Sequence, residues 1–281
     1  MYELIVENHR GEQMKLTGNR NYAVTVSGLF PPAATINTAA VANFDGAKFN
    51  SSCVEPRNIV ITIWPRPPVE QNRLALYRYF KTKQACRLYF KTESRDVYID
   101  GYVETFDGDV HENPQKAQIS ILCPQPFFND RSGTVIDFYN NVPSFTFPFS
   151  IPSEGVPFSS IALNAEKSIV NGGDVATGTR IVLTADGTVE NPKIYNVQTG
   201  ESLILNITMQ SGDRVEIDTN RGSKGVIWIR DGEAVNIISQ LDRTMKWMQL
   251  EPGDNIMTVT ADGYPENLKC AFVFNEKYEG L

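Results

Sequence analysis

The residues able to do metal or nucleophilic chemistry are few and widely spaced in this chain of 281 residues. It has four cysteines and two histidines, and no two cysteines stand at the Cys-x-x-Cys spacing of a zinc site. His9 and His111 lie away from any cysteine in sequence, so each is expected to be a solvated surface residue. We therefore expect no metal site, no cofactor and no disulfide framework. The cysteines are expected to be buried free thiols: Cys53, Cys86, Cys123 and Cys270.

Hydrolytic chemistry finds little support either. The sequence contains no G-x-S-x-G, H-E-x-x-H or G-x-x-x-x-G-K motif. A glycosidase needs two carboxyl groups that face each other across a cleft, and the candidates near one strand are Asp213, Glu216 and Asp218. Glu216 alternates with Val215 and Ile217, so its side chain should point to water. We expect the chain not to be an enzyme.

A sugar-binding site is the alternative that the residues leave open. Trp228, Arg230, Asp218 and Asn220 fall on adjacent expected strands, and an aromatic ring beside polar groups is a common way to hold a sugar. The chain would then be a carbohydrate-binding β-sandwich module involved in host attachment. Trp228, however, lies two positions after Val226 and so falls on the same face of the expected strand, which favours packing in the core.

The elements that would position these residues are mostly strands. Apolar residues alternate with polar ones in "YELIVEN", "NYAVTVSG", "CRLYFKT" and "DVYIDGYVETF", and "NIVITIW" is a β-branched run. One helix is expected in "PRPPVEQNRLALYRYFKTK", where Pro67 and Pro68 suit a helix start. Val69, Leu76 and Phe80 recur there at helical spacing and predict a face that packs in the core.

Two segments interrupt this regularity. Residues 28–57 show little helix or strand pattern over about thirty positions, which is unusual inside a compact domain. The segment carries Phe30, Phe44 and Phe49 without an evident internal partner, so we weigh a subunit-contact arm against a mobile surface loop. Residues 132–157 are rich in proline, which excludes a central strand and predicts an edge-lying segment or a linker.

The second half consists of short alternating runs separated by Asp-Gly, Thr-Gly and Arg-Gly turns. The runs are "TRIVLTADG", "NPKIYNVQTG", "ESLILNITM", "DRVEIDT", "GVIWIRDGE" and "NIMTVTADG". Their spacing predicts an antiparallel β-sandwich, in which only residues 240–248 could hold a helical turn.

The formal charge of −7 is unevenly distributed. Residues 1–131 carry 15 of the 26 basic and 14 of the 33 acidic residues, so the acidic excess lies in the second half. This balance argues against sequence-specific nucleic-acid binding, because phosphate recognition uses a basic stripe. The N-terminal residues show no signal peptide and no long apolar run, so we expect synthesis in a cytoplasm and no membrane partner.

The order of several motifs resembles the siphophage distal tail proteins, the Dit family. The motifs are "NRLALYRYF", "CRLYFKT", "DVYIDGYVETF" and "QISILCPQPFF" in the first half, then "GDRVEIDT" and "WMQLEPGDNIMTV" in the second. In that family the first domain closes on a Cys-Pro-x-Pro-Phe/Tyr motif before the chain crosses to the second. The matching residues here form a boundary motif, expected to act as a buried structural latch: Cys123, Pro124, Pro126, Phe127 and Phe128.

The resemblance implies a mainly β fold. Residues 1–131 would form a split-barrel-like β domain with one helix, residues 132–157 a crossover, and residues 158–281 a galectin-like antiparallel β-sandwich. It also implies a structural role as a homohexameric ring at the tip of a phage or tailocin tail, made in the cytoplasm of the bacterial host. The implied partners are other copies of the chain, a tail tube protein, a tail-associated hub or lysin-type protein, and receptor-binding or baseplate proteins.

Overall fold

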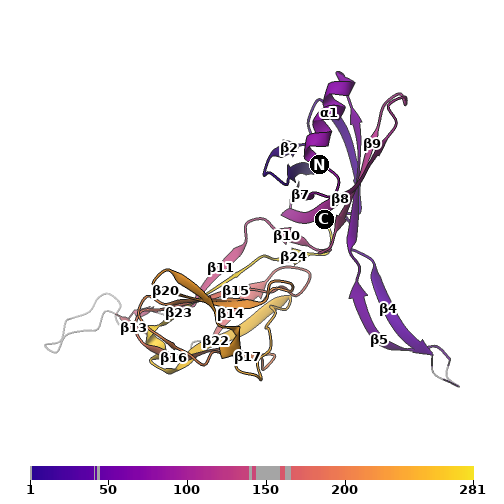
Figure 1. Ribbon diagram of the computed structural model, residues 1–281. Coiled ribbons are helices and arrows are strands. Elements are labelled where there is room, and N and C mark those ends of the chain that lie inside the picture. The colour runs from indigo at the N-terminus through magenta and orange to yellow at the C-terminus, as the bar shows by residue number, and fades with distance from the viewer. Residues whose placement is uncertain (1, 41, 43–44, 139–140, 144–158, 162–165) are drawn as a thin grey trace. The chain divides into compact units, whose positions relative to one another are not determined.

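The computed structural model describes residues 2–40, 42, 45–138, 141–143, 159–161 and 166–281 (Figure 1). The fold is mainly β, as predicted, and the described residues contain one α-helix. They form two compact units, which are described separately: residues 1–132 with 277–281, and residues 133–276.

The first unit is built on one open antiparallel sheet. Its strands follow the order β2-β1-β7-β8-β9-β6-β3, with β10 paired to both β8 and β24. The path runs from one edge to the other without closing, so the expected barrel-like domain is an open sheet in the described residues. The bounds are β1 Glu3–Asn8, β2 Gln13–Lys15, β3 Tyr22–Ser27, β6 Arg57–Pro65, α1 Val69–Tyr79, β7 Ala85–Lys91, β8 Asp96–Gly108, β9 Ala117–Cys123, β10 Phe128–Asp130 and β24 Lys277–Tyr278.

Alternation in the strands explains which face of this sheet is buried. In β6, Ile59, Ile61 and Ile63 are fully buried while the residues between them are more exposed. β8 alternates in the same way, with Val97 and Ile99 in the core. Side chains of successive strand residues point to opposite faces, so one apolar face results.

The helix α1 begins after Pro68 and places Leu76 in the core. Glu70 lies in its first turn and Arg78 in its last, where each charge complements the helix dipole. The phenol of Tyr22 donates a hydrogen bond to the carbonyl oxygen of Asn72 at 3.1 Å, which ties the helix to β3. The predicted helix is therefore present and packs as its spacing indicated.

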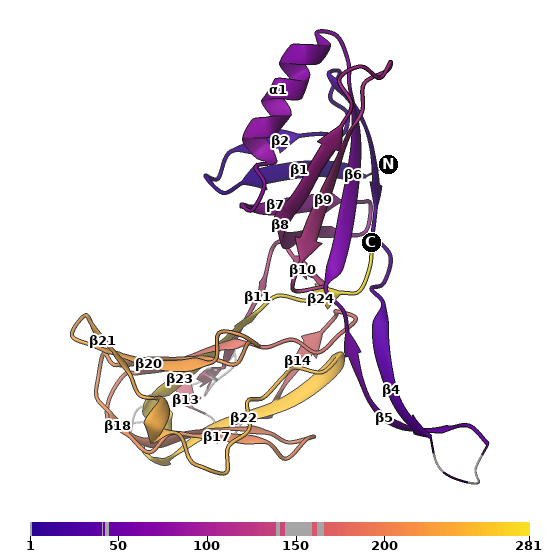
Figure 2. The same ribbon diagram turned by 45° about the vertical axis from the view of Figure 1, so that its right-hand side comes forward.

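Residues 28–57 contain a long β-hairpin, although the sequence showed no strand pattern there. Strand β4 (Ala34–Ala40) pairs antiparallel with β5 (Ala47–Val54), and the hairpin projects away from the sheet at the end opposite α1 (Figures 1 and 2). Every residue of β5 and nearly all of β4 are exposed. Alternation arises when one face is buried, and this hairpin, called the arm below, buries neither.

The second unit is an antiparallel β-sandwich, as predicted. One sheet has the order β11-β23-β15-β19-β20-β21 and the other β14-β22-β16-β17, with β18 also on β16. The bounds are β11 Thr134–Phe138, β14 Glu166–Asn171, β15 Arg180–Ala185, β16 Val189–Asn196, β17 Ser202–Ile204, β18 Thr208–Met209, β19 Arg214–Asp218, β20 Gly225–Arg230, β21 Glu233–Asn236, β22 Gly253–Gly263 and β23 Leu268–Phe274. β12 (Asn141–Pro143) and β13 (Ser159–Ile161) form a separate pair.

The sandwich core contains residues from both sheets. Leu183, Val215 and Phe272 come from the first sheet, and Ile194 and Met257 from the second; all are at most 1% exposed. A core between two sheets is expected when apolar and polar residues alternate in each of the six sequence runs of this half, because each strand then presents one apolar face. The described residues hold two short 3-10 turns. One spans Ile238–Gln240, which begins two residues before the predicted stretch 240–248 and overlaps it at Gln240, and the other spans Pro265–Asn267, which was not predicted.

The C-terminal end of the chain returns to the first unit. β24 pairs with β10, with Tyr278 opposite Phe128 and Lys277 opposite Asn129. Residues 277–281 therefore belong to the first unit, whereas the sequence assigned them to the second domain with residues 158–276. β24 has only two residues, and a strand this short shows no alternation of apolar and polar residues. The return of the chain to the first unit could therefore not be predicted from the sequence.

Candidate subunit interface

The arm presents apolar side chains to solvent. Phe49 is 59% exposed and Ile36 58%, while Phe30, just before β4, is 82% exposed. Phe44, the third phenylalanine of the predicted contact arm, lies outside the described residues. Large exposed apolar groups that gather on one projecting element are typical of an interaction surface.

Arg57 fixes the base of the arm. Its Nη1 donates hydrogen bonds to the carbonyl oxygens of Gly28 and Phe30, both at 2.7 Å, and its Nε donates to that of Pro126 at 2.6 Å. Its Nη2 donates to the carbonyl oxygen of Glu279. The side chain is only 3% exposed, and burial lowers its pKa from the ordinary arginine value. The sequence did not indicate this role, because Arg57 is the last residue of the segment 28–57, in which no strand or helix pattern was found.

The boundary motif packs around Arg57. The guanidinium carbon lies 4.6 Å from the centre of the Phe128 ring, and that ring meets Phe90 edge to face at 5.7 Å. Cys123 and Pro126 are buried with Phe128, whereas Phe127 is half-buried and Pro124 is exposed. The structure thus brings part of the motif together with the base of the arm, a grouping that the sequence did not indicate.

Gly28 is required where the chain enters the arm. Its φ is +86°, and a Cβ at this position would lie 2.2 Å from the carbonyl oxygen of Asn58. Only glycine fits both the left-handed backbone and this close approach. The direction in which the arm leaves the sheet is therefore set by local backbone geometry as well as by Arg57.

An apolar pocket of about 390 Å³ lies beside the base of the arm. We call it the base pocket. It is lined by Tyr2, Val26, Ser27, Gly28, Leu29, Phe30, Thr92 and Leu281. None of these lining residues has a charged side chain, and the backbone N–H of Leu281 donates to the carbonyl oxygen of Leu29 at 3.1 Å. The pocket is suited to an apolar group rather than to an ion.

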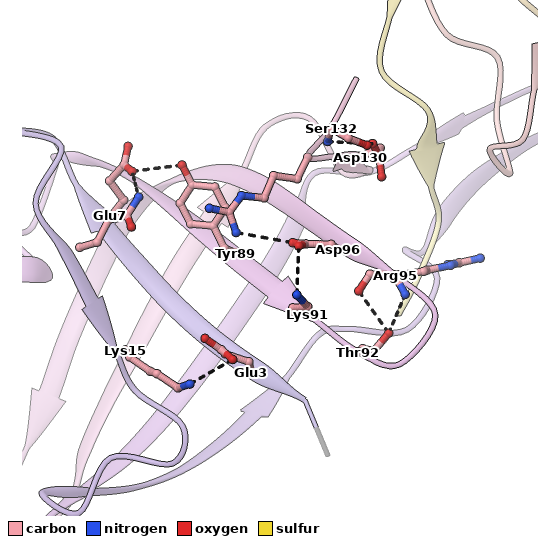
Figure 3. A network of polar contacts seen from close by, with 12 residues as sticks. Glu3, Glu7, Lys15, Tyr89, Lys91, Thr92, Arg95, Asp96, Asp130 and Ser132 are labelled. Atoms are coloured by element: carbon pink, nitrogen blue, oxygen red, sulfur yellow. Dashed lines mark hydrogen bonds and ion pairs between the residues drawn. The ribbon is translucent and has the colours of Figure 1, made fainter. Parts of the chain in front are cut away.

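The outward face of β1, β7 and β8 has a different character. Figure 3 shows Lys15 paired with Glu3, and the phenol of Tyr89 donating to Glu7 at 3.1 Å. Lys91 and Asp96 form a further ion pair on this face (Figure 3). Exposed pairs of this kind contribute little stability, so their main effect is a hydrophilic surface of mixed charge.

In the second unit, the structure separates the four residues of the sugar-site alternative. Trp228 and Arg230 line a pocket of about 570 Å³, and the guanidinium lies 4.4 Å from the centre of the indole ring. Asp218 instead accepts hydrogen bonds from the backbone and side chain of Asn220 at 2.9 Å and from Ser223 at 2.8 Å. These hydrogen bonds stabilise the turn between β19 and β20. Of the four residues of the sugar-site alternative, only Trp228 and Arg230 therefore line the pocket.

Two carboxylates at β19 form ion pairs with arginines: Asp213, which directly precedes the strand, and Glu216 within it. Asp213 is 2% exposed, and its carboxylate accepts hydrogen bonds from Nε and Nη2 of Arg230. These hydrogen bonds lower the pKa of the Asp213 carboxyl. Glu216 pairs with Arg214 at 2.6 Å. A general acid needs a raised pKa, so the Asp213 carboxyl fits a structural role.

The other chemical candidates are placed as follows. Burial raises the pKa of the Cys86 and Cys123 thiols to about 12, and it also raises that of Cys270, while Cys53 on the arm is exposed rather than buried as expected. No group of three or more potential metal-ligating side chains gathers among the described residues. The described part of the chain also has no helix that is long and apolar enough to cross a membrane.

Two family models match the sequence, one in each half. Residues 9–123 match the model described as a phage tail protein RIFT-related domain. Residues 172–278 match the one described as a siphovirus-type tail component, C-terminal domain. None of the curated proteins matches the sequence.

Solved structures of phage tail components share the fold. The Dit protein of phage SPP1, whose title calls it a paradigm of the hub adsorption apparatus in phages that infect Gram-positive bacteria, is 13% identical with a TM-score of 0.70, and 99% of each chain is covered. A chain of the phage P2 baseplate, in its activated conformation with Ca, is 11% identical with a TM-score of 0.56 over 100% of both chains. The same values hold for that baseplate with Sr.

Proposed function

The chain belongs to the siphophage distal tail proteins, and from that premise we propose that it is a structural subunit of the hub at the tip of a siphophage tail. Both family models describe tail components and together they span most of the chain. The SPP1 relative is described as a hub protein. The proposed role is architectural, with no catalytic step.

We propose further that six copies form a ring through the first unit. The observation that carries this proposal is the arm, a hairpin of two strands with both faces exposed and with Ile36 and Phe49 in solvent. An isolated two-stranded hairpin is marginally stable in water, so a projecting one is best explained by a partner that covers it. A neighbouring copy of the chain is the partner that a ring supplies.

The proposed ring would join the tail tube to the remaining tail-tip proteins. Its partners would be the tube protein, a tail-associated hub or lysin-type protein, and receptor-binding or baseplate proteins. The exposed ion pairs on β1, β7 and β8 are compatible with a wet contact to such neighbours. The protein would be located at the tail tip of a virion or a tailocin.

Light scattering over a concentration series tests self-assembly. We expect the solution mass to rise from that of one chain, 31.4 kDa, toward six times that value, and negative-stain images to show six-fold rings with a central hole. A chain that stays monomeric at the highest attainable concentration would contradict the self-assembling ring.

A further inference from the structure

The hairpin formed by β20 and β21 gathers apolar and charged side chains on one of its faces. Its register pairs Trp228 with Val235 and Arg230 with Glu233, so these four side chains share that face. The same face is fully buried at Val226, farther from the turn, whereas Val235 is 55% exposed. The hairpin therefore extends the apolar face of its sheet beyond the part that the sandwich core covers.

The pocket of about 570 Å³ lies against this face, and we call it the hairpin pocket. Its lining divides into an apolar wall, Trp228, Val235 and Ile237, and a charged rim, Arg230, Asp231 and Glu233. The rim lies at the tight turn of the hairpin, where Asp231 and Gly232 both have positive φ. An apolar wall beside a charged rim is suited to a ligand with an apolar body and a charged end.

The one positive charge of the rim is already neutralised within the chain. The Nε and Nη2 of Arg230 donate to the buried carboxylate of Asp213 at 2.8 and 2.5 Å, which holds the guanidinium over the Trp228 ring. Glu233 lies directly opposite Arg230 in the register but forms no ion pair with it. The guanidinium is therefore committed to Asp213, and the pocket keeps an excess of negative charge.

The two carboxylates of the rim supply that excess. Within the described part of the chain, the side chains of Asp231 and Glu233 form no hydrogen bond and no ion pair. Both residues are exposed, so their charges are solvated and available to a ligand. Two such carboxylates at the end of an apolar wall select a cation, because an anion would be repelled and a neutral group would leave both charges unpaired.

We propose that the hairpin pocket binds a lysine side chain of a partner protein. The aliphatic stem of the lysine packs against Trp228 and Val235, as such stems do on apolar surfaces. Its ammonium group donates hydrogen bonds to the carboxylates of Asp231 and Glu233. The site lies in the second unit, so this inference goes beyond the proposed ring and does not depend on it.

The charge of the whole second unit favours a basic partner. Residues 133–276 carry 18 acidic and 10 basic residues, which attracts a lysine-bearing surface and repels an acidic one. β21 is also the edge strand of its sheet, and within the described residues it pairs only with β20 (Figure 2). A partner segment can therefore approach the hairpin pocket from the open side of β21.

Titration of the full chain with two short peptides tests the need for a cation. One is acetyl-Gly-Ser-Lys-Ser-Gly-amide, and the other has norleucine in place of lysine, which keeps an aliphatic stem and removes the charge. The NMR signal of the Trp228 indole N–H, assigned with Trp228→Phe, reports binding. The lysine peptide should shift this signal to saturation, and the norleucine peptide should bind about fivefold more weakly, as expected for loss of an exposed ion pair. Equal affinities would overturn the proposal.

A pair of variants separates the site from general attraction to an acidic unit. Glu233→Gln removes one carboxylate of the rim with little change in shape, and it should weaken the lysine peptide about fivefold. Glu251→Gln is the matched control, because Glu251 is an exposed carboxylate of the second unit outside the pocket lining. The control should bind the peptide like the unchanged chain. Equal weakening by both variants would leave only long-range attraction and would overturn the site.

Glucosamine, titrated in the same way, distinguishes a peptide from an amine-bearing sugar as the source of the cation. Its ammonium group is attached to a hydroxylated ring, which fits the apolar wall less well than the lysine stem does, so it should bind more weakly than the lysine peptide. Tighter binding of glucosamine would overturn the assignment to a partner protein. These titrations report on single chains, so their outcome is independent of whether the ring forms.

Discussion

At the scale of single residues, Arg57 is the side chain on which most of the first unit's connections converge. It binds backbone carbonyl groups from the arm entrance, the boundary motif and the C-terminal segment. The acceptors are main-chain atoms, so the connections depend on the planar, multidentate shape of the guanidinium rather than on particular side chains opposite it.

Replacing Arg57 tests this role. Arg57→Lys keeps the charge but cannot serve four carbonyl groups at once, and a hydrogen bond to a charged group is worth roughly 1.5–3 kcal/mol. We expect the first unit to lose about 3 kcal/mol, measured by urea unfolding with hydrogen exchange of its peptides. Arg87→Lys, in an exposed ion pair with Asp100 at 2.6 Å, should cost less than about 1 kcal/mol. Equal losses would contradict the role.

Glu12 makes a pH-dependent contribution. Its carboxylate accepts hydrogen bonds from Arg78 and Asn8, which lowers its pKa to about 2. Since the unfolded value is about 4.3, the stabilisation is complete above that pH and is lost as the pH falls toward 2. The difference in urea midpoint between the unchanged chain and Glu12→Gln should therefore be present at pH 7 and vanish near pH 2. A constant difference would contradict this assignment.

At the scale of elements, the strands of both sheets could be predicted because each buries one face. Ile59, Ile61 and Ile63 of β6 show the alternation plainly, and Leu76 marks the buried side of α1. The arm could not be predicted as a hairpin, since its residues have no core to face. The role of Arg57 could not be predicted either, because its hydrogen bonds go to four backbone carbonyl groups that lie far from it in the sequence.

Shortening the arm should separate assembly from folding. Residues 35–53 can be replaced by a short Gly-Ser linker between Ala34 and Val54, which already pair. The removed residues of β4 and β5 are almost entirely exposed, so the first unit's stability should change by less than about 1 kcal/mol, while assembly in light scattering should be lost. A large fall in stability would show that the arm packs on its own unit.

At the scale of the whole molecule, the chain leaves the first unit after residue 132 and returns at residue 277. The returning segment supplies β24, a carbonyl for Arg57, and a carbonyl of Gly280 for Arg95, whose guanidinium lies over the Tyr278 ring. The second unit is therefore an insertion in the first, not a domain appended to its end.

Removing residues 277–281 tests the importance of the return. Loss of the β10–β24 pairing and of an acceptor for Arg57 should destabilise the first unit by about 3 kcal/mol and leave the second unit unchanged. Hydrogen exchange followed by mass spectrometry distinguishes the two. Val235→Ser is the control, because Val235 is an exposed residue of the second unit, and it should leave the stability of the first unit unchanged. Matching losses would contradict the proposed role of the backbone.

The double crossing also determines how the molecule carries mechanical load. A pull on residues 133–276 reaches the first unit along two covalent connections, one entering β10 and the other entering β24, and these strands are hydrogen-bonded to each other. The second unit is thus tethered to the first at both strands of one hydrogen-bonded pair, whereas a domain appended to the chain end would be tethered at one point.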